Sequence, residues 1–187
     1  MSTALSSTCM SSRLEVVPAA PEHRPVLENL LELYIHDFSE FVSVDVGEDG
    51  RFGYRNLPLY WSDPRRRPFL ARFDGKLAGF VLVHRAWDAP EESEVWDMAE
   101  FFVLRRFRRR GIGAELAEKV WLLCPGKWQV RVMANNAPAY RFWQSSISRF
   151  TGHAARSTVF EVDGVAWHRF SFESRSEPRS PRAVLQT

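Results

Sequence analysis

The stretch that decides the fold is Val103-Leu104-Arg105-Arg106-Phe107-Arg108-Arg109-Arg110-Gly111-Ile112-Gly113-Ala114. An apolar run typical of a strand ends here, a short basic loop follows, and two glycines open a segment with helical periodicity. The first turn of a helix exposes main-chain N–H groups and the positive end of the helix dipole. This arrangement favours the binding of a phosphate or diphosphate.

Other phosphate-binding patterns fit poorly. The chain has no Gly-x-x-x-x-Gly-Lys-Ser/Thr, and Gly-x-Gly-x-x-Gly fails because residue 116 is Leu. The sequence therefore disfavours nucleotide hydrolysis and dinucleotide redox chemistry. The same glycines and arginines also fit an ordinary strand-to-helix turn with a solvated basic face.

The composition describes a folded protein with one local basic feature. The chain has 187 residues, 45% of them hydrophobic, which is the size and apolar content of a single packed domain. The net charge is +2, and removing the five arginines between positions 105 and 110 leaves −3. This favours a compact anion site over a broad nucleic-acid surface. No apolar run approaches the roughly 20 residues of a membrane span, so a membrane partner is not expected.

Periodicity predicts an α+β fold around one mixed sheet. Asp74-Gly75 is the turn of a hairpin, and a long segment without a clear period, 42–63, follows the first helix. The expected elements are a strand at 14–17, a helix from Glu22 to about Phe41, strands at 69–73, 77–84 and 95–104, a helix at 114–124, a strand at 127–133, a helix after Asn135-Asn136, and strands at 158–162 and 165–172.

The two ends of the chain and the two cysteines indicate the domain bounds, the absence of a metal site and the location less strongly. Residues 1–12 are expected to be a disordered leader without a secretory signal, 13–173 a single domain, and 174–187 a flexible tail. Cys9 and Cys124 suggest neither a disulfide nor a zinc site, so no metal is predicted and a reducing cytoplasm is the expected location.

Two motifs together resemble the GNAT superfamily of acyl-CoA-dependent N-acyltransferases. The family pattern Gln/Arg-x-x-Gly-x-Gly/Ala is matched by Arg108-Arg109-Arg110-Gly111-Ile112-Gly113. One strand later, Asn-x-x-Ala-x-x-Phe-Tyr is matched by Asn136-Ala137-Pro138-Ala139-Tyr140-Arg141-Phe142-Trp143, except at its last position. The resemblance in element order extends over about residues 13–173.

The resemblance implies a mostly antiparallel central sheet with flanking helices, splayed between the strands at about 95–104 and 127–133. Acetyl-CoA would be the cosubstrate, with its diphosphate on main-chain N–H groups and its pantetheine arm paired with the strand before the loop. The positions implied for the cofactor are Phe101, Phe102, Val103, Leu104, Arg108, Arg109, Arg110, Gly111, Ile112, Gly113, Ala114 and Asn136.

The resemblance also implies that a neutral amine attacks the thioester directly in a ternary complex. Glu100 is the candidate base, because apolar surroundings on a central strand would raise its pKa; an ion pair with an arginine is the alternative. Asp97 is a weaker candidate, expected on the opposite face by strand alternation. A strand N–H near Val103 or Leu104 is the candidate oxyanion donor.

The chain departs from the family at two positions. Trp143 replaces a tyrosine whose hydroxyl can reprotonate the CoA thiolate, and an indole N–H cannot act as that acid. Arg131 stands where relatives commonly carry an acidic residue. Tyr140, one turn earlier than Trp143, is the substitute catalytic candidate, with packing as its alternative role.

The acceptor site is expected on the first helix and the loop after it. Tyr34, Asp37 and Trp61 are the candidate substrate-binding residues, since aromatic faces and a carboxylate attract a cation. His36, Tyr54 and Tyr60 lie in the same region, and core packing is the alternative for all the aromatics. The acceptor would be a small-molecule or peptide amine.

Two other functions stay open at this point. One is an acyl-CoA-binding regulatory module without turnover, which the missing tyrosine at Trp143 makes conceivable. The other is nucleic-acid binding through residues 105–110, which the fixed spacing of arginines and glycines in a strand-to-helix turn argues against. The predicted assembly is a monomer or a homodimer, the latter through the exposed last hairpin.

Overall fold

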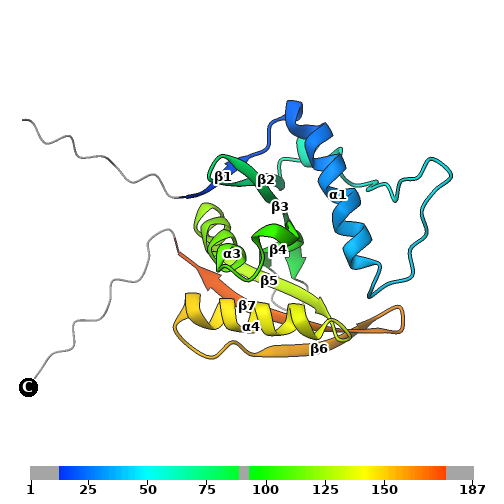
Figure 1. Ribbon diagram of the computed structural model, residues 1–187. Helices are drawn as coiled ribbons and strands as arrows, with labels where there is room; N and C mark the ends of the chain where they lie inside the picture. Colours follow the sequence, from blue (N-terminus) through cyan, green and yellow to red (C-terminus); the bar gives the residue numbers. More distant parts are fainter. Residues whose placement is uncertain (1–12, 89–92, 176–187) are drawn as a thin grey trace, which may run out of the picture.

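The computed structural model describes residues 13–88 and 93–175, which form one seven-stranded sheet in the order β1-β2-β3-β4-β5-β7-β6 (Figure 1). Neighbouring strands are antiparallel except β4 and β5. No helix in these ranges is long and apolar enough to cross a membrane. The elements are β1 (Leu14–Pro18), α1 (Arg24–Phe38), α2 (Leu59–Ser62), β2 (Arg66–Phe73), β3 (Lys76–Asp88), β4 (Ser93–Val103), α3 (Ile112–Leu123), β5 (Gly126–Met133), α4 (Ala137–Thr151), β6 (Ser157–Val162) and β7 (Val165–Ser174).

The predicted α+β architecture is confirmed, with differences at the ends of elements. Helix α1 ends at Phe38 and not near Phe41, and a short 3₁₀ turn at Pro21–His23 precedes it. The predicted tail starts too early, because Ser174 still belongs to β7 and its buried hydroxyl donates to the Trp121 carbonyl at 2.9 Å. Residues 1–12 and 176–187 lie outside the described part of the chain.

The sheet is buried on both faces over its central strands. Alternate residues of β3 enter two separate hydrophobic clusters. Val81 and Val83 pack with α3 and α4 on one face, while Phe80 and Leu82 pack with α1 on the other. This explains the nearly continuous apolar sequence of the central strands, since both faces are covered (Figure 1).

Strands β4 and β5 pair for only two residues, Trp96 with Trp128 and Asp97 with Gln129. After Asp97 no residue of β4 pairs with β5. The two strands therefore diverge, as the resemblance implied. The main-chain groups on this edge of β4 therefore face an opening in the sheet. This opening positions the candidate site.

A β-bulge in β4 corrects one prediction. Glu100 is the partner of Leu82, but Met98 is the partner of Val83, so Ala99 is an extra residue in β4. Because of this extra residue, Asp97 and Glu100 lie on the same face of the sheet, as do their partners His84 and Leu82. The prediction that Asp97 lies on the opposite face is wrong.

The close approach of β3 to β4 at Gly79 gives the first testable prediction. A Cβ added at Gly79 would lie 2.0 Å from the Phe102 main-chain oxygen, which cannot move without breaking the ladder. We expect Gly79→Ala to lower the free energy of unfolding by about 2 to 3 kcal/mol, measured by urea denaturation. Gly47→Ala is the control, because the nearest atom there belongs to the Asp49 side chain. Equal losses in both variants would contradict the prediction.

Candidate active site

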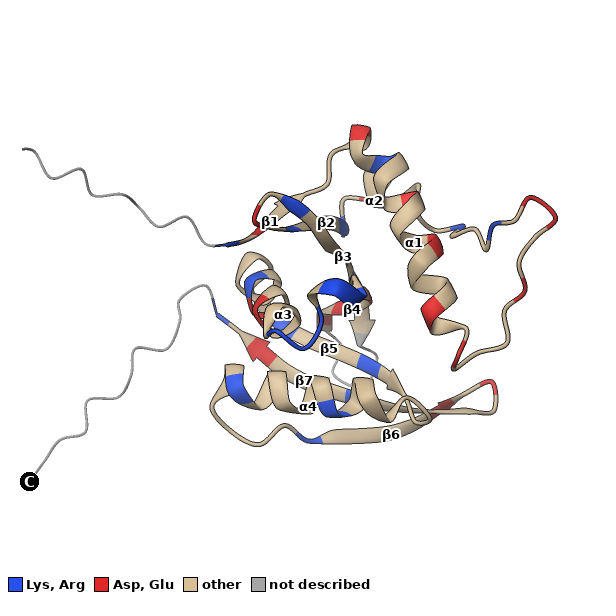
Figure 2. Ribbon diagram, in the orientation of Figure 1, with Lys and Arg blue, Asp and Glu red and all other residues tan. Residues whose placement is uncertain are grey.

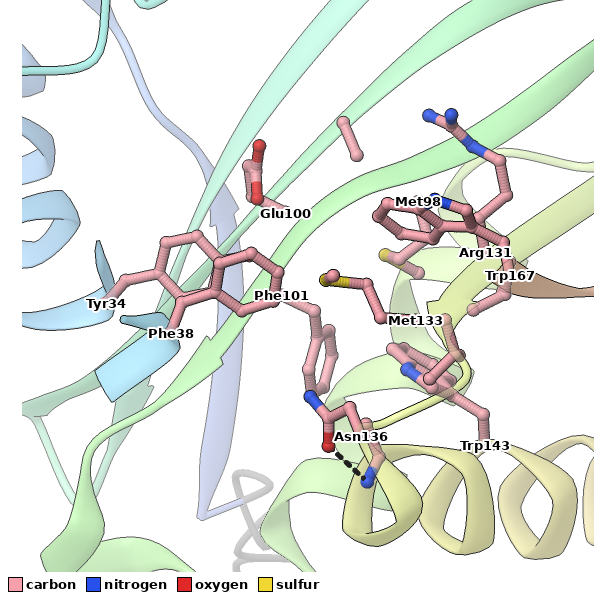
Figure 3. A pocket seen from close by; sticks show the side chains of 14 residues that line it. Tyr34, Phe38, Met98, Glu100, Phe101, Arg131, Met133, Asn136, Trp143 and Trp167 are labelled. Carbon is pink, nitrogen blue, oxygen red and sulfur yellow. Dashed lines mark hydrogen bonds between the residues drawn. The ribbon is translucent and has the colours of Figure 1, made fainter. Parts of the chain in front are cut away.

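A cavity of about 300 Å³ opens where β4 and β5 diverge (Figure 3). Side chains of α1, β4, β5, α4 and β7 line it, so most layers of the fold contribute. The walls are largely apolar, and the charged groups are one carboxylate and one guanidinium. The labelled lining residues are Tyr34, Phe38, Met98, Glu100, Phe101, Arg131, Met133, Asn136, Trp143 and Trp167.

Glu100 is the carboxylate of this cavity, and tyrosines hold it. The Tyr54 hydroxyl donates to Glu100 Oε1 at 2.8 Å. Burial raises the pKa of Glu100 above its usual range, and hydrogen bonds from Tyr34 and Tyr54 offset part of that rise. Burial also raises the pKa values of both tyrosines, so they stay protonated and act as donors. The alternative of an arginine ion pair at Glu100 is not seen among the described residues.

The first helix brings Tyr34 to the same place, as the sequence predicted for a site residue. Its ring lies 5.7 Å from Phe38 and 5.9 Å from Phe102, measured between ring centroids. The sequence did not single out Tyr54, which is one of several aromatic residues in segment 42–63, where no hydrophobic periodicity is present. Its contact with Glu100 spans 46 residues, and the only sequence signal was a phenolic hydroxyl in a long loop.

The basic loop has the conformation of an anion-binding turn. Gly111 has φ +77° and Arg109 has φ +58°, so both lie in the left-handed region. Within the described residues, no acceptor is recorded for the main-chain N–H groups from Arg109 to Ala114. Glu115 donates the first helical bond, to Gly111. These free donors fit a diphosphate.

The two glycines serve different purposes. Gly111 provides the left-handed conformation, and a side chain there would meet nothing within 4 Å. A Cβ at Gly113 would instead lie 3.3 Å from the Phe142 ring and 3.7 Å from Val103 Cγ2. Gly113 therefore allows close packing of α3 against α4 and β4.

Arg108, which was predicted to bind the cofactor, and Asp37, which was predicted to bind the acceptor, contact each other. Arg108 Nε donates to the Val103 carbonyl at 2.6 Å, and its Nη2 contacts Asp37 at 2.7 Å. Arg105 contacts the other Asp37 oxygen at 2.6 Å. Burial alone would raise the pKa of Asp37, but these guanidinium hydrogen bonds hold it below its usual range. Asp37 thus compensates part of the positive charge of the arginine-rich segment between β4 and α3, which is drawn blue in Figure 2.

Main-chain hydrogen bonds reduce the choice of oxyanion donor, which was predicted to be an N–H near Val103 or Leu104. The Leu104 N–H donates to the Ala78 carbonyl at 2.9 Å, so Leu104 is excluded. Main-chain groups alternate along a strand, and those of Phe101 and Val103 therefore point away from β3, toward the opening. Phe101 and Val103 are the residues of this strand whose N–H groups face the cavity side.

Two predicted site residues lie elsewhere. The Tyr140 hydroxyl is 3.3 Å from Ser157 Oγ, and its ring packs on His168 at 4.6 Å, under the last hairpin and not in the cavity. The indole of Trp61 donates to the Ala19 carbonyl at 2.8 Å and packs in the second hydrophobic cluster. For both residues the alternative of a packing role is the one observed.

Helix α4 presents two donors to the cavity. Asn136 caps this helix, with Oδ1 accepting from the Ala139 N–H at 3.0 Å, which leaves its amide nitrogen facing the cavity (Figure 3). Trp143 packs edge-on against Phe101 at 4.8 Å. No partner in the described ranges takes the N–H of either side chain.

Comparison with protein-family models assigns the chain to one family. The model described as "Acetyltransferase (GNAT) family" matches residues 27–146, which is more than half of the chain. Among curated protein sequences, no significant match is found.

Solved structures of similar fold include an acetyltransferase from Thermus thermophilus, 16% identical, with a TM-score of 0.63 over 87% of this chain and 97% of that one. A GNAT family acetyltransferase from Elizabethkingia anophelis with acetyl-CoA bound is 15% identical, with a TM-score of 0.56 over 87% and 99%. An aminoglycoside acetyltransferase from an uncultured soil metagenomic sample, in complex with sisomicin, is 16% identical, with a TM-score of 0.59 over 80% and 94%. At these identities the likeness establishes the fold alone.

The tyrosine contact of Glu100 gives the second prediction. Tyr54→Phe removes a donor that favours the charged carboxylate, so we expect the pKa of Glu100 to rise further. A carbon-13 NMR titration of the glutamate carboxyl groups measures this directly. Tyr140→Phe is the matched control and should leave the Glu100 pKa unchanged, because that hydroxyl contacts Ser157. A downward shift in Tyr54→Phe would contradict the assignment.

Proposed function

Because the chain belongs to the GNAT acetyltransferase family, we propose that it transfers an acetyl group from acetyl-CoA to a primary amine by direct attack within a ternary complex. The observation that carries this proposal is Glu100, a half-buried carboxylate of raised pKa that lines the cavity between β4 and β5. The acceptor is a small-molecule or peptide amine.

The loop from Arg108 to Ala114 would hold the diphosphate of acetyl-CoA. Its main-chain N–H groups supply the hydrogen bonds, and Arg109 and Arg110 supply exposed positive charge. The pantetheine arm would follow the free edge of β4 from Phe101 to Val103. Arg108 must release the Val103 carbonyl to permit that pairing, since its Nε occupies this acceptor here. The free amide nitrogen of Asn136 supports a further contact.

The residues around the cavity suit proton removal from an amine. Glu100 takes one proton of the ammonium group, and its raised pKa makes it a stronger base than a solvated glutamate. The neutral amine then attacks the thioester carbonyl, and its nitrogen loses a second proton to water as the carbon–sulfur bond breaks. Tyr34 and Tyr54 fix its orientation. As the nitrogen–carbon bond forms, an N–H of Phe101 or Val103 stabilises the charge on the carbonyl oxygen.

The CoA thiolate would not be protonated by a tyrosine in this chain, because Trp143 stands at that position. Trp143 lines the cavity and offers an indole N–H, which donates a hydrogen bond but no proton. The carbon–sulfur bond therefore breaks to give a thiolate that is solvated by this donor, and water supplies its proton after release.

A second function is favoured by the same tryptophan: an acyl-CoA-binding regulatory module without turnover. CoA release in the presence of a panel of amines separates the two. Our proposal expects release with at least one amine, whereas thermal stabilisation by acetyl-CoA without turnover on any amine supports the module.

The role of Glu100 gives a third prediction. Glu100→Gln preserves size but cannot accept the proton, so we expect kcat to fall by about 100-fold to 10,000-fold with the dissociation constant of acetyl-CoA unchanged. In the parent enzyme, kcat/KM should fall as pH drops through the raised pKa of Glu100. A variant that keeps the parent rate and pH profile would remove Glu100 from the mechanism.

The cofactor loop gives a fourth prediction. Arg109→Gln combined with Arg110→Gln should weaken acetyl-CoA binding about tenfold, or about 1.4 kcal/mol, and reduce its salt dependence. Isothermal titration calorimetry at two salt concentrations measures both effects. Arg55→Gln combined with Arg156→Gln removes the same charge from exposed positions outside the loop and should leave binding unchanged. Unaltered affinity in the loop variant would refute this binding mode.

A further inference from the structure

An ion pair between a buried aspartate and a partly exposed arginine lies where β4 and β5 separate. The Asp97 side chain is 1% exposed and accepts from Arg131 at both oxygens, from Nε at 3.3 Å and from Nη2 at 2.5 Å. His84 Nε2 lies 3.7 Å from the same carboxylate, and burial lowers the pKa of His84, so Arg131 is its charged partner. Asp97 is therefore neutralised and inaccessible from the cavity.

Arg131 still has donors to offer after this pairing. A guanidinium carries five N–H groups, and Asp97 occupies one on Nε and one on Nη2. The remaining three include both on Nη1. The Arg131 side chain is 40% exposed and lines the cavity. It thus presents part of a rigid donor fork to the space where an acceptor would bind.

The cavity has two charged walls of opposite sign. Glu100 approaches it from β4 and Arg131 from β5 (Figure 3). The surfaces between them are apolar, with Phe101, Met133 and Trp167 among the lining residues. A volume of about 300 Å³ is at the small end for ligand sites, which favours a metabolite over a long peptide.

We infer that the acceptor is an amine that also carries a carboxylate, an amino-acid-like zwitterion whose ammonium group faces Glu100 and whose carboxylate binds the free donors of Arg131. The inference rests on the proposed function and adds the substrate class to it. A planar guanidinium fork matches the geometry of a carboxylate, and the apolar walls suit a hydrophobic side chain. Arg131 is thus the specificity-determining residue.

Matched ligands test this directly. We would measure binding of leucine, methionine and phenylalanine, each against its own amide, to the full chain saturated with CoA, by calorimetry and by tryptophan fluorescence. The amide keeps the size and side chain of the acid but replaces the charged carboxylate by a neutral group with two N–H donors. We expect at least one amino acid to bind about 10-fold to 100-fold more tightly than its amide, as for a hydrogen bond to a charged group. Equal binding, tighter binding of the amides, or no binding of any amino acid would overturn the inference.

Variants then locate the selectivity. Arg131→Gln combined with Asp97→Asn removes both charges of this pair, so no uncompensated charge remains. It should reduce the acid-over-amide selectivity to near one. Glu118→Gln combined with Arg149→Gln removes an exposed ion pair on α3 and α4 and should keep the parent selectivity. Selectivity that survives in the first variant would overturn the role of Arg131.

A lysine variant and a separate assay of CoA release distinguish loss of selectivity from unfolding and from loss of turnover. Arg131→Lys retains a cation beside Asp97 in case the double variant unfolds, and it should still lose about tenfold in selectivity, because a lysine has no planar fork. Binding in the presence of CoA does not require turnover. Selective binding without CoA release from acetyl-CoA would therefore refute the transfer reaction and leave the ligand class intact.

Discussion

The structure depends on the separation of two neighbouring strands after a pairing of only two residues. Trp96 and Asp97 pair with β5, and beyond them β4 runs alone on that edge. The strand stays in place because its two faces are anchored in different hydrophobic clusters, through Met98 on one side and Phe102 on the other. An open edge in the middle of a sheet leaves main-chain donors and acceptors without partners, so this position is prepared to bind an extended ligand.

The arginine loop before α3 is connected to α1 through Arg108. Arg108 contacts the Val103 carbonyl, the Asp37 carboxylate and, at 5.4 Å, the Phe102 ring. Arg105 contacts the second oxygen of Asp37. These contacts join the loop to the end of the helix that also carries Tyr34 and Phe38 into the cavity.

Local features could be predicted from the sequence, and long-range side-chain contacts could not. The hairpin at Asp74-Gly75, the cap at Asn136 and the glycine turn at Gly111 depend on residues close in the chain. The contacts of Glu100 with Tyr54 and of Asp37 with Arg108 span 46 and 71 residues, and no period encodes them. The bulge at Ala99 also has no signature in the sequence, and simple alternation therefore gave the wrong face for Asp97.

Three carboxylates were candidates in the sequence: Asp37, Asp97 and Glu100. They have different partners in the structure, and the partners affect how readily each carboxylate can accept a proton. Asp37 is held by two guanidinium groups and Asp97 by one, so arginine charge lies beside each of these carboxylates. Glu100 contacts neutral tyrosines instead; desolvation raises its pKa, and the tyrosine hydrogen bonds offset only part of that rise. A general base needs an exchangeable proton at moderate pH, and a carboxylate locked to arginine binds that proton too weakly. Among these three groups, only Glu100 meets that requirement.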